Sequence, residues 1–314
     1  MQLFGLCTLL FAVLVLFTSR WTVFEADSLA DNPDNRRPLI EEQRVPRGLI
    51  LASDGRTVLA RSRGRGRGQN RIYTRTYPRG AAFAHPIGFS YIRNGRRGLE
   101  LSRNDDLVGD EDEFESILAE LESRDREGND VVTTLDVAGT EAARAALAGR
   151  KGAVVAIEPR TGKVRVMVSV PEYDPNLIPS DIGSFNRDPN QPLLNRTTQE
   201  VYPPGSTFKV VTATAALDTG AVTPETMIDG SSPREISGMP LENAGNESFG
   251  QLSFTDALTN SVNTVFAQVG EEIGRGTLVE YMRRFGFYED PQLDYPDSYM
   301  IASGILNGEG DYVD

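Results

Sequence analysis

One serine and one lysine stand at a spacing that suits acyl transfer. The segment Pro203–Lys209 reads PPGSTFK and runs into an apolar stretch. Its glycine predicts a tight turn into a helix, so that Ser206 falls in the first turn, where free N–H groups and the helix dipole favour negative charge on oxygen. Lys209 comes three residues later, on the same face. Apolar neighbours would lower the pKa of its ammonium, which a general base near neutral pH requires.

A serine next to such a base is a typical acyl-transfer nucleophile. The alternative is a serine that begins a helix and an unrelated surface lysine. A second pair, Ser261 and Asn263, lies at a predicted break between two helical segments. A hydroxyl and an amide at positions i and i+2 can reach one cleft, where the hydroxyl would pass protons and the amide would orient an amide substrate. The alternative for this pair is an ordinary helix N-terminus.

The composition excludes several other kinds of site. The net charge of the chain is −13, so a phosphate backbone would repel it, and we expect no nucleic-acid partner. His85 and Cys7 are the only histidine and cysteine, which rules out a disulfide framework and any zinc site with several such ligands. The sequence contains no G-x-S-x-G, G-x-x-x-x-G-K-[ST] or H-E-x-x-H motif. We interpret His85 as a surface or packing residue.

The N-terminus carries an apolar stretch without charges over residues 3–17, which reaches 22 residues when residues 18–24 are added. A helix that crosses a bilayer needs about 20 such residues. Arg20 and Trp21 stand near the outer end, where an arginine can snorkel and a tryptophan is favoured. We therefore expect an uncleaved, single-pass membrane anchor over residues 3–24, with the rest of the chain outside the cytoplasm. A cleaved signal peptide is the alternative.

The remaining pattern predicts an α+β fold with helices packed on an antiparallel sheet. Two β-hairpins are expected, at residues 49–60 around a D-G turn and at residues 152–169 around a P-R-T-G turn. Ser253 and Asp256 resemble a capping box. Helices are expected over 137–147, 206–218, 253–273 with a break near 260, and 277–284.

Polar, charged and proline-rich segments separate these elements. Low-complexity arginine and glycine repeats at 61–68 are expected to form a solvated loop; an RNA contact is the less favoured alternative. The other segments are expected to be a juxtamembrane linker over 25–48, a solvated helix within 103–127 and a loop over 170–205.

Longer segments resemble class B penicillin-binding proteins, the peptidoglycan D,D-transpeptidases, and among them the shorter actinobacterial penicillin-binding protein A type. They follow one another in the order expected for that family. They are ADSLADNPDNRR (26–37), RGLILASDGR (47–56), GLE (98–100), GAVVAIEPRTGKVRVMVSVPEYDPN (152–176), LLNRTTQEVYPPGSTFKVVTATAAL (193–217) and ALTNSVNTVFAQVGEEIG (257–274).

The resemblance implies a role for each candidate residue. Ser206 would attack the D-Ala-D-Ala carbonyl of a stem peptide and form an acyl-enzyme, and Lys209 would take its proton. Ser261 would help to return a proton to the leaving D-alanine, and Asn263 would hold the substrate amide. The amine of a second stem peptide would then complete the cross-link.

The resemblance also implies the domains and partners. Residues 1–24 would be a transmembrane anchor, 25–130 a β-rich, non-catalytic pedestal or dimerisation domain, and 131–314 a serine penicillin-recognising transpeptidase domain. β-Lactams would acylate the same Ser206, no metal or cofactor would be needed, and the pedestal would dock a lipid-II polymerase of the SEDS family. The chain would lie on the extracytoplasmic side of the cell membrane.

One motif of the family is missing. In the family, a strand with the motif K-[ST]-G follows the S-x-N motif. This chain has no lysine after Asn263, so it cannot contain that motif. That strand would supply part of the oxyanion hole, so we expect the chain to be an N-terminal, inactive part of a longer transpeptidase. The alternatives are a non-catalytic, membrane-anchored scaffold for the polymerase, and a relative that senses or hydrolyses β-lactams.

Overall fold

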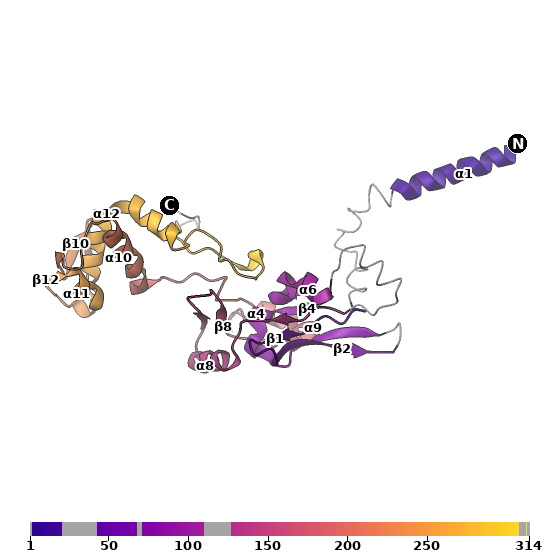
Figure 1. Ribbon diagram of the computed structural model, residues 1–314, viewed down its shortest axis with the longest axis horizontal. Helices are drawn as coiled ribbons and strands as arrows, with labels where there is room; N and C mark the ends of the chain where they lie inside the picture. Colours follow the sequence, from indigo (N-terminus) through magenta and orange to yellow (C-terminus); the bar gives the residue numbers. More distant parts are fainter. Residues whose placement is uncertain (1, 21–42, 68–70, 110–126, 308–311, 313–314) are drawn as a thin grey trace. The chain divides into compact units, whose positions relative to one another are not determined.

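The computed structural model describes residues 2–20, 43–67, 71–109, 127–307 and 312 (Figure 1). Its Cα positions separate into two compact units, Met1–Leu194 and Asn195–Asp314, and each is described by itself. Both units mix helices with antiparallel strands, which confirms the predicted α+β class. The predicted domain boundary at residue 130 stays a prediction.

The N-terminal apolar stretch forms helix α1, Gln2–Ser19. Within the described parts of the chain, no helix combines the length and apolarity that a membrane crossing requires. Most of the expected linker, residues 25–42, lies outside the described residues, as does most of the helix expected within 103–127.

A four-stranded sheet organises the first unit, in the order β3-β2-β1-β6. The predicted first hairpin is confirmed: β1 (Ile50–Leu51) pairs antiparallel with β2 (Val58–Arg65). At its turn Asp54 Oδ1 accepts a hydrogen bond from the N–H of Thr57 at 2.8 Å. The outer strands are β3 (Ile72–Thr76), antiparallel to β2, and β6 (Val131–Val132), parallel to β1.

The expected loop over 61–68 is wrong for its first half. Residues 61–65 continue β2 and pair with β3 in register from Arg61 opposite Thr76 to Arg65 opposite Ile72. Arginines alternate with small residues here, so the segment has the period of two that a strand requires. It lacks the alternation of apolar and polar residues that usually indicates a strand. The pairing with β3 decides its conformation.

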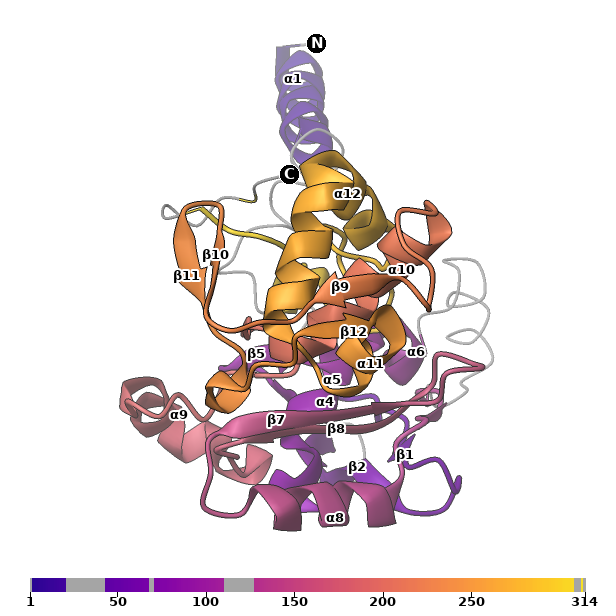
Figure 2. The ribbon, with the colours of Figure 1, turned by 90° about the vertical axis from the view of Figure 1, so that its left-hand side faces the viewer.

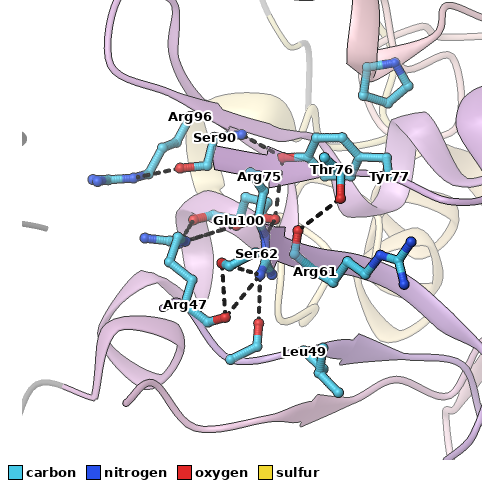
Figure 3. A network of polar contacts seen from close by, with 12 residues as sticks. Arg47, Leu49, Arg61, Ser62, Arg75, Thr76, Tyr77, Ser90, Arg96 and Glu100 are labelled. Carbon is cyan, nitrogen blue, oxygen red and sulfur yellow. Dashed lines mark hydrogen bonds and ion pairs between the residues drawn. The ribbon is translucent and has the colours of Figure 1, made fainter. Parts of the chain in front are cut away.

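A buried carboxylate connects this sheet to the short helices next to it. Glu100 lies in α5 (Leu99–Ser102) with no exposed surface. Its Oε1 accepts from Arg75 Nε at 2.5 Å and from the hydroxyl of Tyr77 at 3.3 Å, and its Oε2 pairs with Arg47 at 3.2 Å (Figure 3). Buried charges persist in proteins when they are paired and hydrogen-bonded, as these are.

Short elements complete this part of the first unit. Among them, His85 is buried and meets the ring of Tyr173 edge-on at 5.3 Å, so the structure places it as a packing residue. The elements are η3 (Gly80–Phe83), α4 (Ala84–Ile87), β4 (Phe89–Tyr91), β5 (Gly95–Arg97) and α6 (Asn104–Val108).

The second predicted hairpin and its helix are also confirmed. α8 (Val137–Leu147) begins at Asp136, whose side chain accepts from the N–H of Gly139. β7 (Gly152–Ile157) pairs antiparallel with β8 (Val164–Val170). Figure 2 shows α8 beside this hairpin, where Ala143 packs against Val166 and Val168.

The expected loop over 170–205 contains helices. η4 (Pro175–Leu177) continues into α9 (Ile178–Arg187). Asp174 begins this helical segment, because its Oδ1 accepts from the N–H of Asn176 at 2.9 Å, and Pro175 supplies the backbone angle that a first helical turn needs. Polar residues in this segment cap a helix, which is why its composition resembles that of a loop.

The second unit packs helices with two short antiparallel ladders. α10 (Lys209–Asp218) and α12 (Asn263–Arg284) form its centre, and α11 (Phe254–Thr259) precedes α12. The predicted capping box is confirmed, since Ser253 Oγ accepts from the N–H of Asp256 at 3.1 Å. The other elements are β9 (Met227–Asp229) with β12 (Gln251–Ser253), β10 (Arg234–Ile236) with β11 (Met239–Leu241), η6 (Ala244–Asn246) and η7 (Asp297–Tyr299).

The last two predicted helices form one bent helix. α12 bends at Gly274, whose φ of 77° and ψ of 163° are open to glycine and strained for other residues. Before the bend, Val265 and Val269 pack in one apolar cluster with Ala213 and Ala216 of α10. After it, Tyr281 and Met282 pack with Val211 and Ala215 in a second cluster.

Candidate active site

The candidate nucleophile lies in a short 3₁₀ turn. η5 (Gly205–Phe208) follows Pro203 and Pro204, and α10 begins directly after it at Lys209. Gly205 has a φ of +56°, which permits the abrupt change of direction without strain. In 3₁₀ geometry the side chains at i and i+3 eclipse, so this turn aligns Ser206 with Lys209 more closely than an α-helix would. Ser206 is exposed and Lys209 is half-buried.

The second pair of candidates lies at the junction of α11 and α12. Ser261 holds a left-handed backbone with a φ of +55°, which is uncommon for a residue other than glycine. Val262 is buried beside it and fixes the junction, and Asn263 begins α12. This strained corner turns the Ser261 hydroxyl and the Asn263 amide toward the same point.

Ser261 and Asn263 both face the amine of Lys209. Its Nζ lies 2.7 Å from Asn263 Oδ1, 2.6 Å from the carbonyl oxygen of Ser261 and 3.0 Å from Ser261 Oγ. It lies 3.4 Å from Ser206 Oγ. The structure therefore brings all four predicted site residues together, although they come from two helix starts far apart in sequence.

The two hydroxyls form a continuous path to the amine. Ser261 Oγ lies 3.0 Å from Ser206 Oγ and 3.0 Å from Lys209 Nζ. Both steps are shorter than the direct separation of 3.4 Å between Ser206 and Lys209. A proton leaving Ser206 thus has a route through Ser261 with good hydrogen-bond distances at each step.

Burial favours the neutral form of Lys209. Desolvation lowers the pKa of its amine below the ordinary lysine value. A neutral amine has two N–H groups and one lone pair. With the N–H groups directed to Asn263 Oδ1 and the Ser261 carbonyl, the lone pair remains for a hydroxyl proton.

A buried asparagine that sequence reasoning missed holds this arrangement. Asn243 Oδ1 accepts from the N–H of Thr264 at 3.0 Å, which satisfies a free donor in the first turn of α12. Its Nδ2 donates to the carbonyls of Gly230 and Glu247 at 3.0 and 2.9 Å. The preceding carbonyl, of Glu242, accepts from Asn263 Nδ2 at 3.0 Å and so directs Asn263 Oδ1 to the lysine.

Nothing in the sequence around Asn243 indicates this role. It lies in the polar stretch LENAGNESFG, where an asparagine is typical of turns. Among the described residues, no His, Cys, Asp or Glu side chains form a group that could hold a metal ion.

Comparison with known proteins identifies the class. Residues 47–131 match the model of the penicillin binding protein A dimerisation domain, and residues 152–301 match that of the penicillin binding protein transpeptidase domain. The chain belongs to the penicillin-binding protein family of transpeptidases.

Relatives of the A type lie within that family. The chain is 38% identical over 292 residues to the peptidoglycan D,D-transpeptidase PbpA of Mycolicibacterium smegmatis, covering 86% of this chain and 58% of the relative. It is 37% identical to PbpA of Mycobacterium tuberculosis, covering 95% of this chain and 63% of the relative. The predicted resemblance to the penicillin-binding protein A type is thus confirmed, and the chain spans about 60% of the length of these two relatives.

A solved structure is similar as well. Penicillin-binding protein A from M. tuberculosis, as an imipenem acyl-enzyme complex, superposes with a TM-score of 0.75 at 32% identity. The match covers 87% of this chain and 65% of that one. The α+β fold is therefore that of a penicillin-binding transpeptidase.

Proposed function

We propose that the natural protein is a peptidoglycan D,D-transpeptidase that works through an acyl-enzyme on Ser206. The observation that carries the proposal is the position of Lys209 Nζ, within hydrogen-bond reach of both serine hydroxyls and of Asn263 Oδ1. The names of the relatives and the imipenem acyl-enzyme of a similar structure support it.

In the acylation step, Ser206 Oγ attacks the carbonyl carbon of the terminal D-Ala-D-Ala bond. Its proton passes to the neutral amine of Lys209, directly or through Ser261. The C–N bond then breaks. Ser261 gives its hydroxyl proton to the nitrogen of the leaving D-alanine and takes the proton held by Lys209, which leaves an ester on Ser206 and a neutral lysine. Asn263 orients the substrate amide. Asn263 is itself held in place by the carbonyl of Glu242 and by Asn243, which caps the first turn of α12.

In the second step, the amine of another stem peptide attacks the ester carbonyl. The ester C–O bond breaks, the amine proton passes to Lys209, and the Ser206 oxygen takes a proton back. A new amide bond joins the two stem peptides. A β-lactam enters the first step in the same way, because its strained amide acylates Ser206.

Labelling with fluorescent penicillin tests this function, using the protein expressed from its complete natural gene. Wild type should carry a stable label and Ser206→Ala should carry none. Ser184→Ala, an exposed serine in α9, is the matched control and should label like wild type. Equal labelling of wild type and Ser206→Ala would refute the nucleophile. Rapid release of the label would point to a β-lactam-hydrolysing relative, and an unlabelled wild type to a non-catalytic scaffold.

The location and the polymerase partner are further proposals. A position at the cell membrane is supported by the exposed apolar side chains of α1, such as Phe4 and Phe11, and the extracytoplasmic side rests on the family resemblance. Fractionation of cells should place the chain with the membrane, and removal of residues 1–24 should release it. Docking of a SEDS-family polymerase on residues 25–130 rests on the family resemblance, and co-purification with that region deleted tests it.

A further inference from the structure

The β2–β3 hairpin carries a concentration of positive charge that the transpeptidase site does not use. Residues 55–99 contain eleven arginines and no aspartate or glutamate, in a chain whose net charge is −13. Within the described residues, Arg63, Arg65 and Arg67 are exposed and form no ion pair with an acidic side chain. An unneutralised basic patch on an acidic protein indicates an anionic partner.

The register of the hairpin sorts these arginines by face. Side chains on a strand alternate between its two faces, and directly opposed residues share a face. Arg61, Arg63 and Arg65 therefore lie on one face, about 7 Å apart along the strand. Opposite them on the same face are Thr76, Thr74 and Ile72. We call the face formed by these six residues the arginine face.

The other face of the hairpin is occupied. Ser62 and Arg75 point to it, and both hydrogen-bond the backbone carbonyl of Arg47. Figure 3 shows Arg61 extending away from Glu100, while Arg75 reaches toward it. On the arginine face, Arg63, Arg65 and Thr74 are exposed, and the face also presents Ile72, which is 44% exposed.

The hairpin follows the apolar N-terminal helix in the sequence, after an intervening segment of residues 20–42. The first described residue after the gap in the described chain, Gln43, accepts a hydrogen bond at its carbonyl from the N–H of Tyr73 in β3, at 2.8 Å. Residues 20–42 separate it from α1, and a chain of that length spans at most roughly 80 Å. A membrane that holds α1 therefore lies within reach of the arginine face.

We propose that the arginine face docks on the anionic phospholipid headgroups of the membrane that holds α1. Guanidinium groups bind phosphate bidentately, and Ile72 adds an apolar contact at the headgroup boundary. Each basic side chain near an anionic bilayer strengthens binding by about fivefold. The proposal rests on the proposed membrane location of α1, and it is independent of Ser206 chemistry.

Vesicle binding of the full chain tests the proposal. Phosphatidylcholine vesicles report binding through α1 alone, and vesicles that also contain phosphatidylglycerol report the added electrostatic part. Wild type should bind the anionic vesicles about 100-fold more tightly at low salt, and this gain should shrink as salt is added. The variant Arg61→Gln, Arg63→Gln, Arg65→Gln, which removes the three arginines of the arginine face, should lose most of the gain and keep its binding to phosphatidylcholine.

A matched variant controls for net charge. Arg150→Gln, Arg160→Gln, Arg187→Gln removes the same charge from other exposed positions of the first unit and should keep the gain. An equal loss in both variants, or no effect of phosphatidylglycerol, overturns the proposal. Tighter binding of RNA or of a poly(glycerol phosphate) wall polymer than of the vesicles overturns the lipid as partner. Failure to bind phosphatidylcholine refutes the location of α1 separately, and a Ser206→Ala chain should behave as wild type.

Discussion

Asn263 Oδ1 lies 2.7 Å from the amine of Lys209, while Ser206 Oγ lies 3.4 Å from it. The amide of Asn263 therefore holds the lysine in place. Its orientation is fixed, because Nδ2 donates to the carbonyl of Glu242 at 3.0 Å. A neutral oxygen at this position accepts an N–H without adding a negative charge that would keep the lysine protonated.

The pH dependence of acylation follows from this contact. Burial lowers the pKa of Lys209, so the rate of β-lactam acylation should rise with pH as the amine loses its proton, with a midpoint below the ordinary lysine value of 10.5. Asn263→Asp places a carboxylate beside the amine and should move the midpoint to higher pH. Rates measured over a pH series check this, on the protein expressed from its complete natural gene as for the other acylation rates below, and an unchanged midpoint in the variant would contradict it.

Two substitutions of Ser261 distinguish the role of its hydroxyl in proton transfer from the strain of its left-handed backbone. Ser261→Ala and Ser261→Gly both remove the hydroxyl between Ser206 and Lys209, and both should slow acylation by about 10² or more. The φ of +55° suits glycine, so Ser261→Gly should be more stable than Ser261→Ala by about 1 kcal/mol. Acylation rates and urea unfolding give the two quantities. A Ser261→Ala protein that acylates at the wild-type rate would exclude Ser261 from proton transfer.

Asn243 should matter for both stability and site geometry. Asn243→Ala leaves the buried N–H of Thr264 without a partner and removes one donor from the carbonyls of Gly230 and Glu247, which should cost about 3 kcal/mol. Acylation should also slow at low temperature, where the protein stays folded, because α12 loses its fixed start. Asn186→Ala, an exposed residue of α9, should change stability by less than about 0.5 kcal/mol. Similar unfolding curves for the two variants would show that Asn243 holds nothing.

Glu100 should dominate the stability of the first unit. Glu100→Gln leaves Arg75 and Arg47 buried without their counter-charge, which should cost about 3–5 kcal/mol. Asp106→Asn breaks only the exposed ion pair with Arg103 and should cost less than about 1 kcal/mol. Denaturant unfolding of the two variants compares them directly, and equal midpoints would show that the buried network is replaceable.

The sequence predicted the parts of the site that depend on local spacing. Ser206 and Lys209 are three residues apart at the start of a helix, so their contact follows from helix geometry alone. That Ser261 and Asn263 reach the same lysine depends on the packing of α12 against α10, which periodicity does not reveal. The family resemblance supplied that expectation, and the geometry agrees with it.

The misread segments share a physical cause. Arg61 to Arg65 form a strand because β3 pairs with them, and Asn243 caps α12 because the fold brings it next to Thr264. In both cases the deciding partner lies outside the segment itself, in the next strand for residues 61–65 and in α12 for Asn243. Asp174 and Pro175 are different, since a capping residue before a proline is a local helix signal that the polar composition concealed.

The bend at Gly274 gives one helix two contact surfaces on another. A straight α12 would touch α10 along a single stripe, whereas the bent helix packs against Ala213 and Ala216 with its first arm and against Val211 and Ala215 with its second. The helix that begins at Lys209 is thus held by two separate apolar clusters. A side chain at residue 274 would strain this bend and loosen these contacts, so the alignment of Lys209 depends on a glycine eleven residues after the start of the neighbouring helix.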